Sequence, residues 1–183
     1  MFLKKLTRLF QIVLLSGMLL SHIEIASAQS NGGGQAQLVE GRAIIVRQGK
    51  EIEIDSYPMD FKDQDLIQTF DKGKVHLTLK GGDVIFLAPK TEIQFEEKLE
   101  TKGLAKIINR TLKLKGRLLA KIQRNPATKI QIRTPNAIVG VKGTEFVVEF
   151  LSKATNVGTL KGTVNLSSLS TGDSIDLKAG TMS

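Results

Sequence analysis

From Leu38 onward, the sequence is a succession of short runs in which apolar and polar residues alternate, with turn-forming residues between them. In Val75–Leu79 and in Phe146–Phe150, every second residue is apolar. Side chains of a β-strand point alternately to its two faces, so this period of two predicts strands that are buried on one face. Segments such as Gly81–Asp83 supply the glycine and aspartate that tight turns favour. We therefore expect an all-β fold over residues 38–183.

A weak internal repeat indicates how these strands are arranged. An aliphatic residue followed by Lys-Gly recurs at Leu79–Gly81, Leu114–Gly116, Val141–Gly143 and Leu160–Gly162. A chain that turns corners repeatedly by the same device can stack its strands as successive coils, so the repeat predicts short stacked strands, as in a β-solenoid. Because Lys-Gly also ends many ordinary hairpins, an irregular β-sandwich is the alternative.

Residues 98–112 are the exception to the alternation. Basic residues at positions 98, 102, 106 and 110, with the apolar Leu104, Ile107 and Ile108 between them, fit the 3.6-residue period of an amphipathic helix. Gly103 weakens this interpretation, because glycine is a poor helix former. We expect at most one short helix in the chain, near residues 100–111.

Residues 1–28 have the parts of a signal peptide for export. A basic start at Lys4–Arg8 precedes an apolar run, Leu9–Leu20, and Ala26–Ala28 places small residues at the positions that signal peptidase reads. The apolar run is too short to cross a bilayer as a helix, and no later segment resembles a transmembrane span. We expect a periplasmic or secreted mature protein, whose polar, glycine-rich residues 29–37 form a flexible lead-in.

The composition leaves few residues for catalysis or metal binding. The 183 residues include no Cys, and of the two His only His76 lies beyond the predicted signal peptide. Zinc sites need several His or Cys ligands, so we expect no metal, no cofactor and no catalytic residue. We expect His76 to lie in the middle of a strand on its outward side. The acids Asp60, Asp63 and Asp65 lack the spacing of an EF-hand, and we interpret them as part of a solvated loop.

Basic residues gather between positions 98 and 133, where eleven of them stand against a single acid. Four of these residues fall on the outward side of an alternating run and form the candidate binding face: Lys113, Lys115, Arg117 and Lys121. No aromatic residue for base stacking lies between Phe95 and Phe146, so we expect no nucleic-acid partner. The expected partner is an envelope protein or an anionic envelope polymer.

The most informative segment comprises residues 130–146. Pro135 ends a strand because it has no amide hydrogen to donate, and Thr134 before it is confined to extended geometry. Gly140 and Gly143 permit sharp changes of direction or a close approach of the backbone. The segment therefore predicts a strand, a corner and a second strand.

This segment resembles the signature of the FecR periplasmic domain family, in which TP-x-A-x-x-G-V-[RK]-G-T-x-F follows a Gly-Arg strand. The matching residues are Thr134, Pro135, Ala137, Gly140, Val141, Lys142, Gly143, Thr144 and Phe146. The strand Gly116–Leu118 and the run Asp65–Thr69 are similar to other parts of the family's pattern, so the likeness covers about residues 38–183. The resemblance implies an all-β fold of stacked strands in which the motif residues are structural.

The namesake members of this family relay transporter occupancy to a sigma factor through a cytoplasmic segment and a membrane helix. Because an export signal begins at residue 1, we expect neither part here and do not carry over the anti-sigma role. The resemblance implies a non-enzymatic exported module for envelope sensing, scaffolding or partner binding. The alternative is a carbohydrate-active or other hydrolytic enzyme, which requires a cleft containing at least two of Asp60, Asp63 and Asp65.

Overall fold

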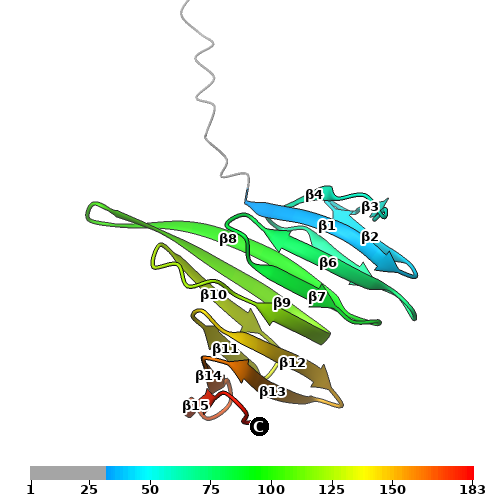
Figure 1. The fold of residues 1–183 in the computed structure, drawn as a ribbon. Helices are drawn as coiled ribbons and strands as arrows, with labels where there is room; N and C mark the ends of the chain where they lie inside the picture. The colour runs from blue at the N-terminus through cyan, green and yellow to red at the C-terminus, as the bar shows by residue number, and fades with distance from the viewer. Residues whose placement is uncertain (1–31) are drawn as a thin grey trace, which may run out of the picture.

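The computed structural model describes residues 32–183, and every regular element in this range is a β-strand (Figure 1). The predicted signal peptide, residues 1–28, lies outside the described residues. No helix in the described range is long and apolar enough to cross a membrane. The all-β prediction is confirmed.

The strands form two sheets that share one long strand, β9. Sheet A runs in the order β4 (Met59–Lys62), β1 (Gly33–Glu40), β6 (Lys74–Leu79), β7 (Val84–Leu87), β9 (Ala105–Lys121), β12 (Glu145–Leu151) and β13 (Ala154–Lys161). Sheet B runs in the order β3 (Lys50–Glu53), β2 (Ala43–Arg47), β5 (Leu66–Thr69), β8 (Glu92–Lys102), β9, β10 (Thr128–Arg133), β11 (Ala137–Val141), β14 (Thr163–Ser168) and β15 (Ser174–Lys178). Neither sheet closes on itself.

The two sheets meet within β9. Its first part pairs with β8 and β10 in sheet B, and its last part, from Gly116, pairs with β7 and β12 in sheet A. Gly116 has a φ of 109°, which side chains rarely allow, and a Cβ there would lie 2.6 Å from Thr91 Oγ1. Glycine therefore lets the strand bend across Thr91 from one sheet into the other.

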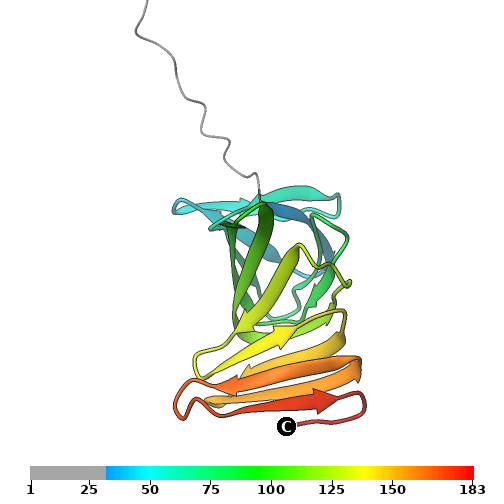
Figure 2. The same cartoon turned by 90° about the vertical axis from the view of Figure 1, so that its left-hand side faces the viewer.

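The strand pairing does not confirm a β-solenoid. Successive coils of a parallel solenoid pair in parallel, whereas β9 and β10 form the single parallel pair among the described strands and the others pair antiparallel. The later strands nevertheless gather at one end of the molecule, with β11 to β15, yellow to red, at the opposite end from β1 (Figure 2).

One apolar core lies between the sheets. The alternation in β6 directs Val75, Leu77 and Leu79 inward, and each is at most 2% exposed. Phe61 of sheet A and Phe95 of sheet B meet edge to face, with ring centroids 5.3 Å apart. The inward residues of both sheets belong to one continuous cluster, so the period of two correctly identified the buried face of the strands.

The expected helix near residues 100–111 is absent, and that prediction was wrong. This region is a hairpin of β8 and β9 joined by the two-residue turn Gly103–Leu104, with Gly103 at a φ of 60°. Ile107 pairs with Glu100 and Ile108 with Leu99, so neighbouring apolar residues point to opposite faces of the ribbon. The pairing of β9 with β8 determines the strand conformation, and the spacing of apolar residues within this segment gives no information about that pairing.

The prediction of a flexible lead-in was also wrong for positions 33–37, because β1 begins at Gly33. A Cβ at Gly33 would lie 2.0 Å from the carbonyl oxygen of Phe61, and one at Gly34 would lie 2.0 Å from that of Thr78. The glycines therefore allow β4 and β6 to approach β1 closely, where we expected them to provide freedom.

The C-terminal residues cover the outer edge of β13. The amide of Thr159 donates to the carbonyl of Thr181 at 3.0 Å, and the amide of Ser183 donates to that of Val157 at 3.0 Å. Met182 is thereby placed beside Gly158. The segment after β15 of sheet B thus also contacts the last strand of sheet A.

Candidate functional site

The motif residues Thr134–Ala137 form the turn between β10 and β11. Thr134 is 2% exposed, and its Oγ1 accepts a hydrogen bond from the amide of Ala137 at 3.0 Å. The same oxygen lies 2.7 Å from Oγ1 of Thr155 in β13, which ties the turn in sheet B to sheet A. The hydrogen bonds of Thr134 therefore stabilise the backbone of the turn between β10 and β11.

The second half of the motif carries the chain from sheet B into sheet A. Gly143 lies at the crossing with a φ of 67°, close to Arg124, and the carbonyl of Thr144 accepts from the amide of Ile122 at 2.8 Å. Phe146 then enters the core and is fully buried. Two further motif residues precede this crossing: Val141 ends β11 and is half-buried against the core, and Lys142 follows it and is exposed.

Gly140 has a different role from the one expected. It lies in the middle of β11, opposite Gln131 and Asn165, without a left-handed φ. The nearest atoms to a Cβ there would be those of Asn165, at 3.8 Å or more, so the strand has room for a side chain. The prediction of a direction change therefore holds for Gly143 and was wrong for Gly140.

The candidate binding face is divided between the two sheets. Lys113 and Lys115 point outward from sheet B, where they pair with β8, whereas Arg117 and Lys121 point outward from sheet A beside β12. The bend at Gly116 separates the two pairs. The four side chains therefore do not form one continuous surface.

Ion pairs also compensate much of this positive charge. Lys113 pairs with Glu96 and Arg117 with Glu149, and Lys115 Nζ lies 3.7 Å from Glu92. These acids come from β8 and β12, so they are distant in sequence from the basic residues that they neutralise. The surface around these four residues therefore carries less net positive charge than the count of basic residues in the sequence suggests.

The sheet B half of the face lines a shallow pocket of about 400 Å³. Lys113 and Lys115 line it together with Arg133, Thr134 and Pro135. This pocket brings part of the predicted face next to the start of the family motif. Arg133 was not singled out from the sequence, although it directly precedes the motif.

An apolar row crosses the outer surface of sheet A and was not predicted. The strand register places His76 opposite Phe86, Phe86 opposite Leu119, and Leu119 opposite Val147. Val147 lies opposite Gly158, and Gly158 opposite the exposed Met182. We call the set His76, Phe86, Leu119, Val147 and Met182 the apolar row.

A shallow hollow of about 300 Å³ follows the middle of this row. Val39, Phe86, Leu119 and Val147 line it, and Phe86 and Val39 are 45% and 60% exposed. Charged residues border the part of the apolar row on β9 and β12 on both sides, with Arg117 and Glu149 in one flanking line and Lys121 and Glu145 in the other. This part of the surface thus has an apolar centre and a charged rim.

His76 lies in β6 as expected, on the outward face, but Phe86 covers it. The two rings stack with centroids 4.7 Å apart and an angle of 8° between their planes. Its Nε2 is buried and has no hydrogen-bond partner among the described residues. The geometry gives this imidazole a packing role within the apolar row.

Asp65, one of the three acids of the enzymatic alternative, is buried and held by hydrogen bonds. Its carboxylate is 2% exposed and accepts hydrogen bonds from Arg47 Nη2 at 2.7 Å and from the amide of Lys62 at 2.8 Å. The hydrogen bonds between Arg47 and Asp65 raise the pKa of Arg47 above its ordinary value. Asp65 therefore holds the turn between β4 and β5, and the expectation that it is solvated was wrong.

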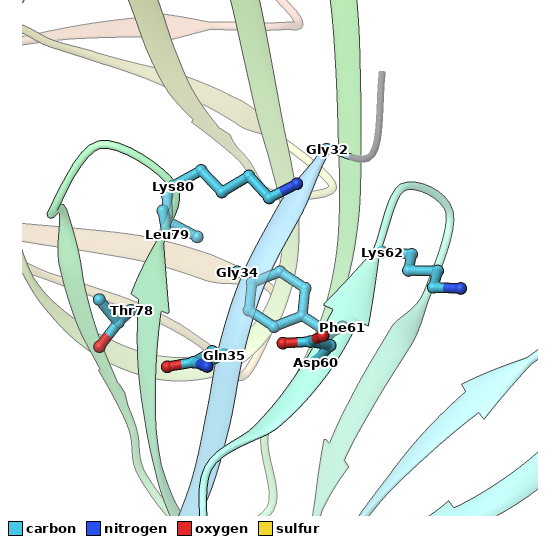
Figure 3. Close-up of a pocket in the computed structure, with 9 residues that line it drawn as sticks. All are labelled: Gly32, Gly34, Gln35, Asp60, Phe61, Lys62, Thr78, Leu79 and Lys80. Atoms are coloured by element: carbon cyan, nitrogen blue, oxygen red, sulfur yellow. The ribbon is translucent and has the colours of Figure 1, made fainter. Parts of the chain in front are cut away.

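Asp63 and Asp60 differ in their contacts. Asp63 accepts a hydrogen bond from the amide of Glu97 at 2.7 Å, whereas Asp60 is exposed on β4. Asp60 lines a pocket of about 500 Å³ between β1, β4 and β6, together with Lys62 and Lys80 (Figure 3). Neither Asp63 nor Asp65 lines it, and no group of acids and histidines in residues 32–183 is arranged to hold a metal ion.

These roles predict unequal effects of removing the two charges. Asp65→Asn should lower the free energy of unfolding by about 2 kcal/mol, because it weakens hydrogen bonds between charged groups in a buried position. Asp60→Asn should change it by less than about 0.5 kcal/mol, because Asp60 is exposed. Urea unfolding of both variants measures the difference, and equal losses would contradict the assigned roles.

The comparisons with known proteins agree with the geometry of the motif. The family described as FecR protein matches residues 65–165, which include both the Asp65 turn and the motif. No curated protein matches the chain.

The fold is similar to that of a protein from Parabacteroides distasonis ATCC 8503, described as a candidate anti-sigma factor and solved at 2.50 Å and at 1.65 Å resolution. The TM-scores are 0.53 and 0.52 at 19% sequence identity, and the match covers 64% of this chain and 52% of the other. The likeness thus concerns about half of that protein and shows a shared fold. Since the FecR match spans more than half of this sequence and contains the motif that joins its two sheets, the chain belongs to the FecR family.

Proposed function

We propose that this chain acts after export as a non-enzymatic FecR module that binds another protein of the cell envelope through the apolar row on sheet A. A role in signalling or sensing agrees with its family. Of the two kinds of partner expected from the sequence, an envelope protein and an anionic envelope polymer, we propose the protein.

The observation that carries the proposal is the continuity of the apolar row. Scattered apolar residues are common on protein surfaces, whereas a contiguous patch with a polar rim is typical of an interaction site. Here the register aligns His76, Phe86, Leu119 and Val147 on four neighbouring strands. A rigid sheet holds these side chains in place, so little conformational freedom is lost when a partner covers them.

The charges around the row favour a protein over a polyanion. A polyanion binds best to uncompensated positive charge, whereas Arg117 is already paired with Glu149, and Lys121 lies opposite Glu145. An apolar centre with both signs of charge at its rim is the usual anatomy of a protein–protein interface. The same compensation holds on sheet B, where Lys113 and Lys115 lie near acids of β8.

The hydrolytic alternative lacks its required geometry in the described range. It needs two of the three acids in one cleft, and the pocket between β1, β4 and β6 contains Asp60 alone among them. Asp63 and Asp65 hold backbone amides of Glu97 and Lys62. These contacts give Asp63 and Asp65 structural roles, which favours the binding module over the hydrolytic alternative.

Placing a charge within the apolar row should strongly weaken partner binding. The full-length mature chain is immobilised and exposed to envelope extract of the native host at 0.5 M salt, where apolar contacts persist and exposed charge pairs are screened. We expect a protein retained by the wild type to bind Phe86→Asp at least about tenfold more weakly, because central interface residues dominate the binding energy.

Two further variants separate this surface from the others. Ile175→Asp places the same charge at an exposed apolar residue of β15 on sheet B, and it should retain the partner. Lys113→Gln with Lys115→Gln tests the basic pocket and should retain it as well. Loss with the lysine variant but not with Phe86→Asp would move the binding site to sheet B and reject the proposed surface.

A further inference from the structure

The β8–β9 hairpin extends beyond the body of the molecule as a two-stranded arm, which we define as residues 98–107. The neighbouring strand β5 pairs with β8 only at residues 92–94, and β10 pairs with β9 only from Ile108. No other described strand pairs with the arm, and Figure 1 shows it projecting at the left, away from both sheets. The arm contains five residues of β8, 98–102, and three of β9, 105–107, and its longer strand spans about 16 Å.

The tip of the arm exposes apolar surface. Leu104, in the two-residue turn, is fully exposed at 106%, and Leu99 is 54% exposed further back. Ile107 is half-buried although it lies on the opposite face of the ribbon from Leu99. An isolated two-stranded ribbon is only marginally stable in water, so an arm with an apolar tip gains stability from an environment that covers it.

Positive charge surrounds this apolar tip. Lys102 and Lys106 lie two residues from Leu104 on its two sides, and Lys98 lies four residues behind Lys102. The arm contains a single acid, Glu100, which pairs with Lys102 at 3.2 Å. Lys98 and Lys106 have no ion pair with another described residue. Unlike the lysines of the pocket on sheet B, these two therefore keep their charge uncompensated.

We propose that the arm inserts its tip into the surface of an anionic lipid bilayer. An apolar tip between flanking lysines is the chemistry that such an interface recognises, because the leucine leaves water while the ammonium groups stay among the phosphates. Lysines on both faces of the ribbon suit a headgroup layer that surrounds the arm, whereas a single protein groove would contact mainly one face. This site is separate from the apolar row and does not depend on it.

The dimensions of the arm match those of the interface. Interfacial elements reach about 5–10 Å into the boundary between headgroups and acyl chains. At about 3.3 Å per residue, insertion to this depth buries the turn Gly103–Leu104 and places Lys102 and Lys106 at the level of the phosphates. Lys98, about 13 Å behind Lys102, lies beyond the Debye length of about 8 Å at physiological salt, so the attraction to the phosphates comes mainly from Lys102 and Lys106.

The absence of tryptophan from the sequence provides a direct reporter. Leu104→Trp in the full mature chain gives a protein whose single tryptophan lies at the tip. On addition of vesicles with 30% phosphatidylglycerol in phosphatidylcholine, we expect its emission to shift to the blue and brominated acyl chains to quench it. Pure phosphatidylcholine vesicles should give little of either effect.

Leu151→Trp is the matched control. Leu151 is also an exposed leucine, at 50%, beside a two-residue hairpin turn that carries a lysine, Lys153. That turn belongs to β12 and β13 and lies on the other side of the molecule from the arm (Figure 1). Its tryptophan should keep the emission of a residue in water with either kind of vesicle.

Co-sedimentation with the same vesicles tests the contribution of each group in the protein without tryptophan. Lys102→Gln with Lys106→Gln should lower the partition constant about 30-fold, because each lysine near an anionic surface contributes about fivefold. Leu104→Ser should lower it at least about tenfold, because the apolar insertion is lost. Thermal unfolding of each variant in the absence of lipid should be unchanged, because these side chains are exposed.

The outcomes separate the membrane from other occupants. An unshifted and unquenched Leu104→Trp emission in anionic vesicles would overturn the proposal, as would equal binding to neutral vesicles, which would remove the role of the lysines. A blue shift produced by envelope proteins in detergent but not by vesicles would assign the arm to a protein and reject the bilayer. Each of these results is independent of whether Phe86→Asp affects the partner on sheet A.

Discussion

Gly116→Ala should lower the free energy of unfolding by about 3 kcal/mol or more. At a φ of 109°, an alanine is strained, and its Cβ would lie 2.6 Å from Thr91 Oγ1 and 2.8 Å from the carbonyl oxygen of Lys90. Thr91 is fully buried, and its hydroxyl accepts from the amide of Arg117 at 3.0 Å, so it cannot move aside without breaking the contact between the sheets. The loss is measured from the midpoint and slope of urea unfolding.

Gly49→Ala is the control for the backbone contribution. Gly49 also has a positive φ, 79°, but a Cβ there would meet no atom within 4 Å. Its replacement should cost only about 1 kcal/mol, from backbone strain alone. If both substitutions cost the same, the crossing at Gly116 is not closely packed, and the account of how β9 joins the sheets is wrong.

Arg110→Met should lower the free energy of unfolding by about 3–5 kcal/mol. Arg110 is 4% exposed and lies between two acids, with its Nε 2.8 Å from Glu97 Oε2 and its Nη1 3.5 Å from Asp83 Oδ2. Asp83 in turn accepts from the amide of Gln123 at 2.8 Å. Methionine preserves much of the volume but leaves two nearly buried carboxylates without the guanidinium, which is the costly way to break a buried ion pair.

Arg117→Met provides the comparison in the same strand. The ion pair between Arg117 and Glu149 lies at the surface, with 55% of the arginine side chain exposed, so its loss should cost less than about 1 kcal/mol. Adding Asp83→Asn and Glu97→Gln to Arg110→Met should recover part of the lost stability, because the uncompensated charges are removed. Failure of this recovery would show that the loss comes from packing and not from charge.

Predictions from the sequence were most successful where a short pattern determines the structure of the same short segment. The alternation in β6 and β12 identified the inward residues, because successive side chains of any strand face opposite sides. The segment 130–146 identified the family, because its turn and crossing need particular residues, such as Gly143, at fixed positions. The prediction of a direction change or close backbone approach failed at Gly140, because this glycine of the motif has neither a left-handed φ nor a close neighbour.

Charge was predicted less well than apolar burial. The count of basic residues between positions 98 and 133 was correct, but a count contains no information about the acids that fold against them. Glu149 reaches Arg117 from 32 residues away, and Glu92 approaches Lys115 from the neighbouring strand. The true uncompensated charge of this stretch includes Lys98 and Lys106 of the arm, which the helical interpretation did not set apart.

Period and motif were thus sufficient to establish an all-β chain of the FecR family, because both depend on interactions within a few residues. The assignment of each strand to a sheet, the division of the four basic residues at Gly116, the apolar row and the free arm all depend on which distant strands pair. The row exists because the register of four strands places His76, Phe86, Leu119 and Val147 side by side. Such a register is set by long-range packing, and no window of the sequence contains it.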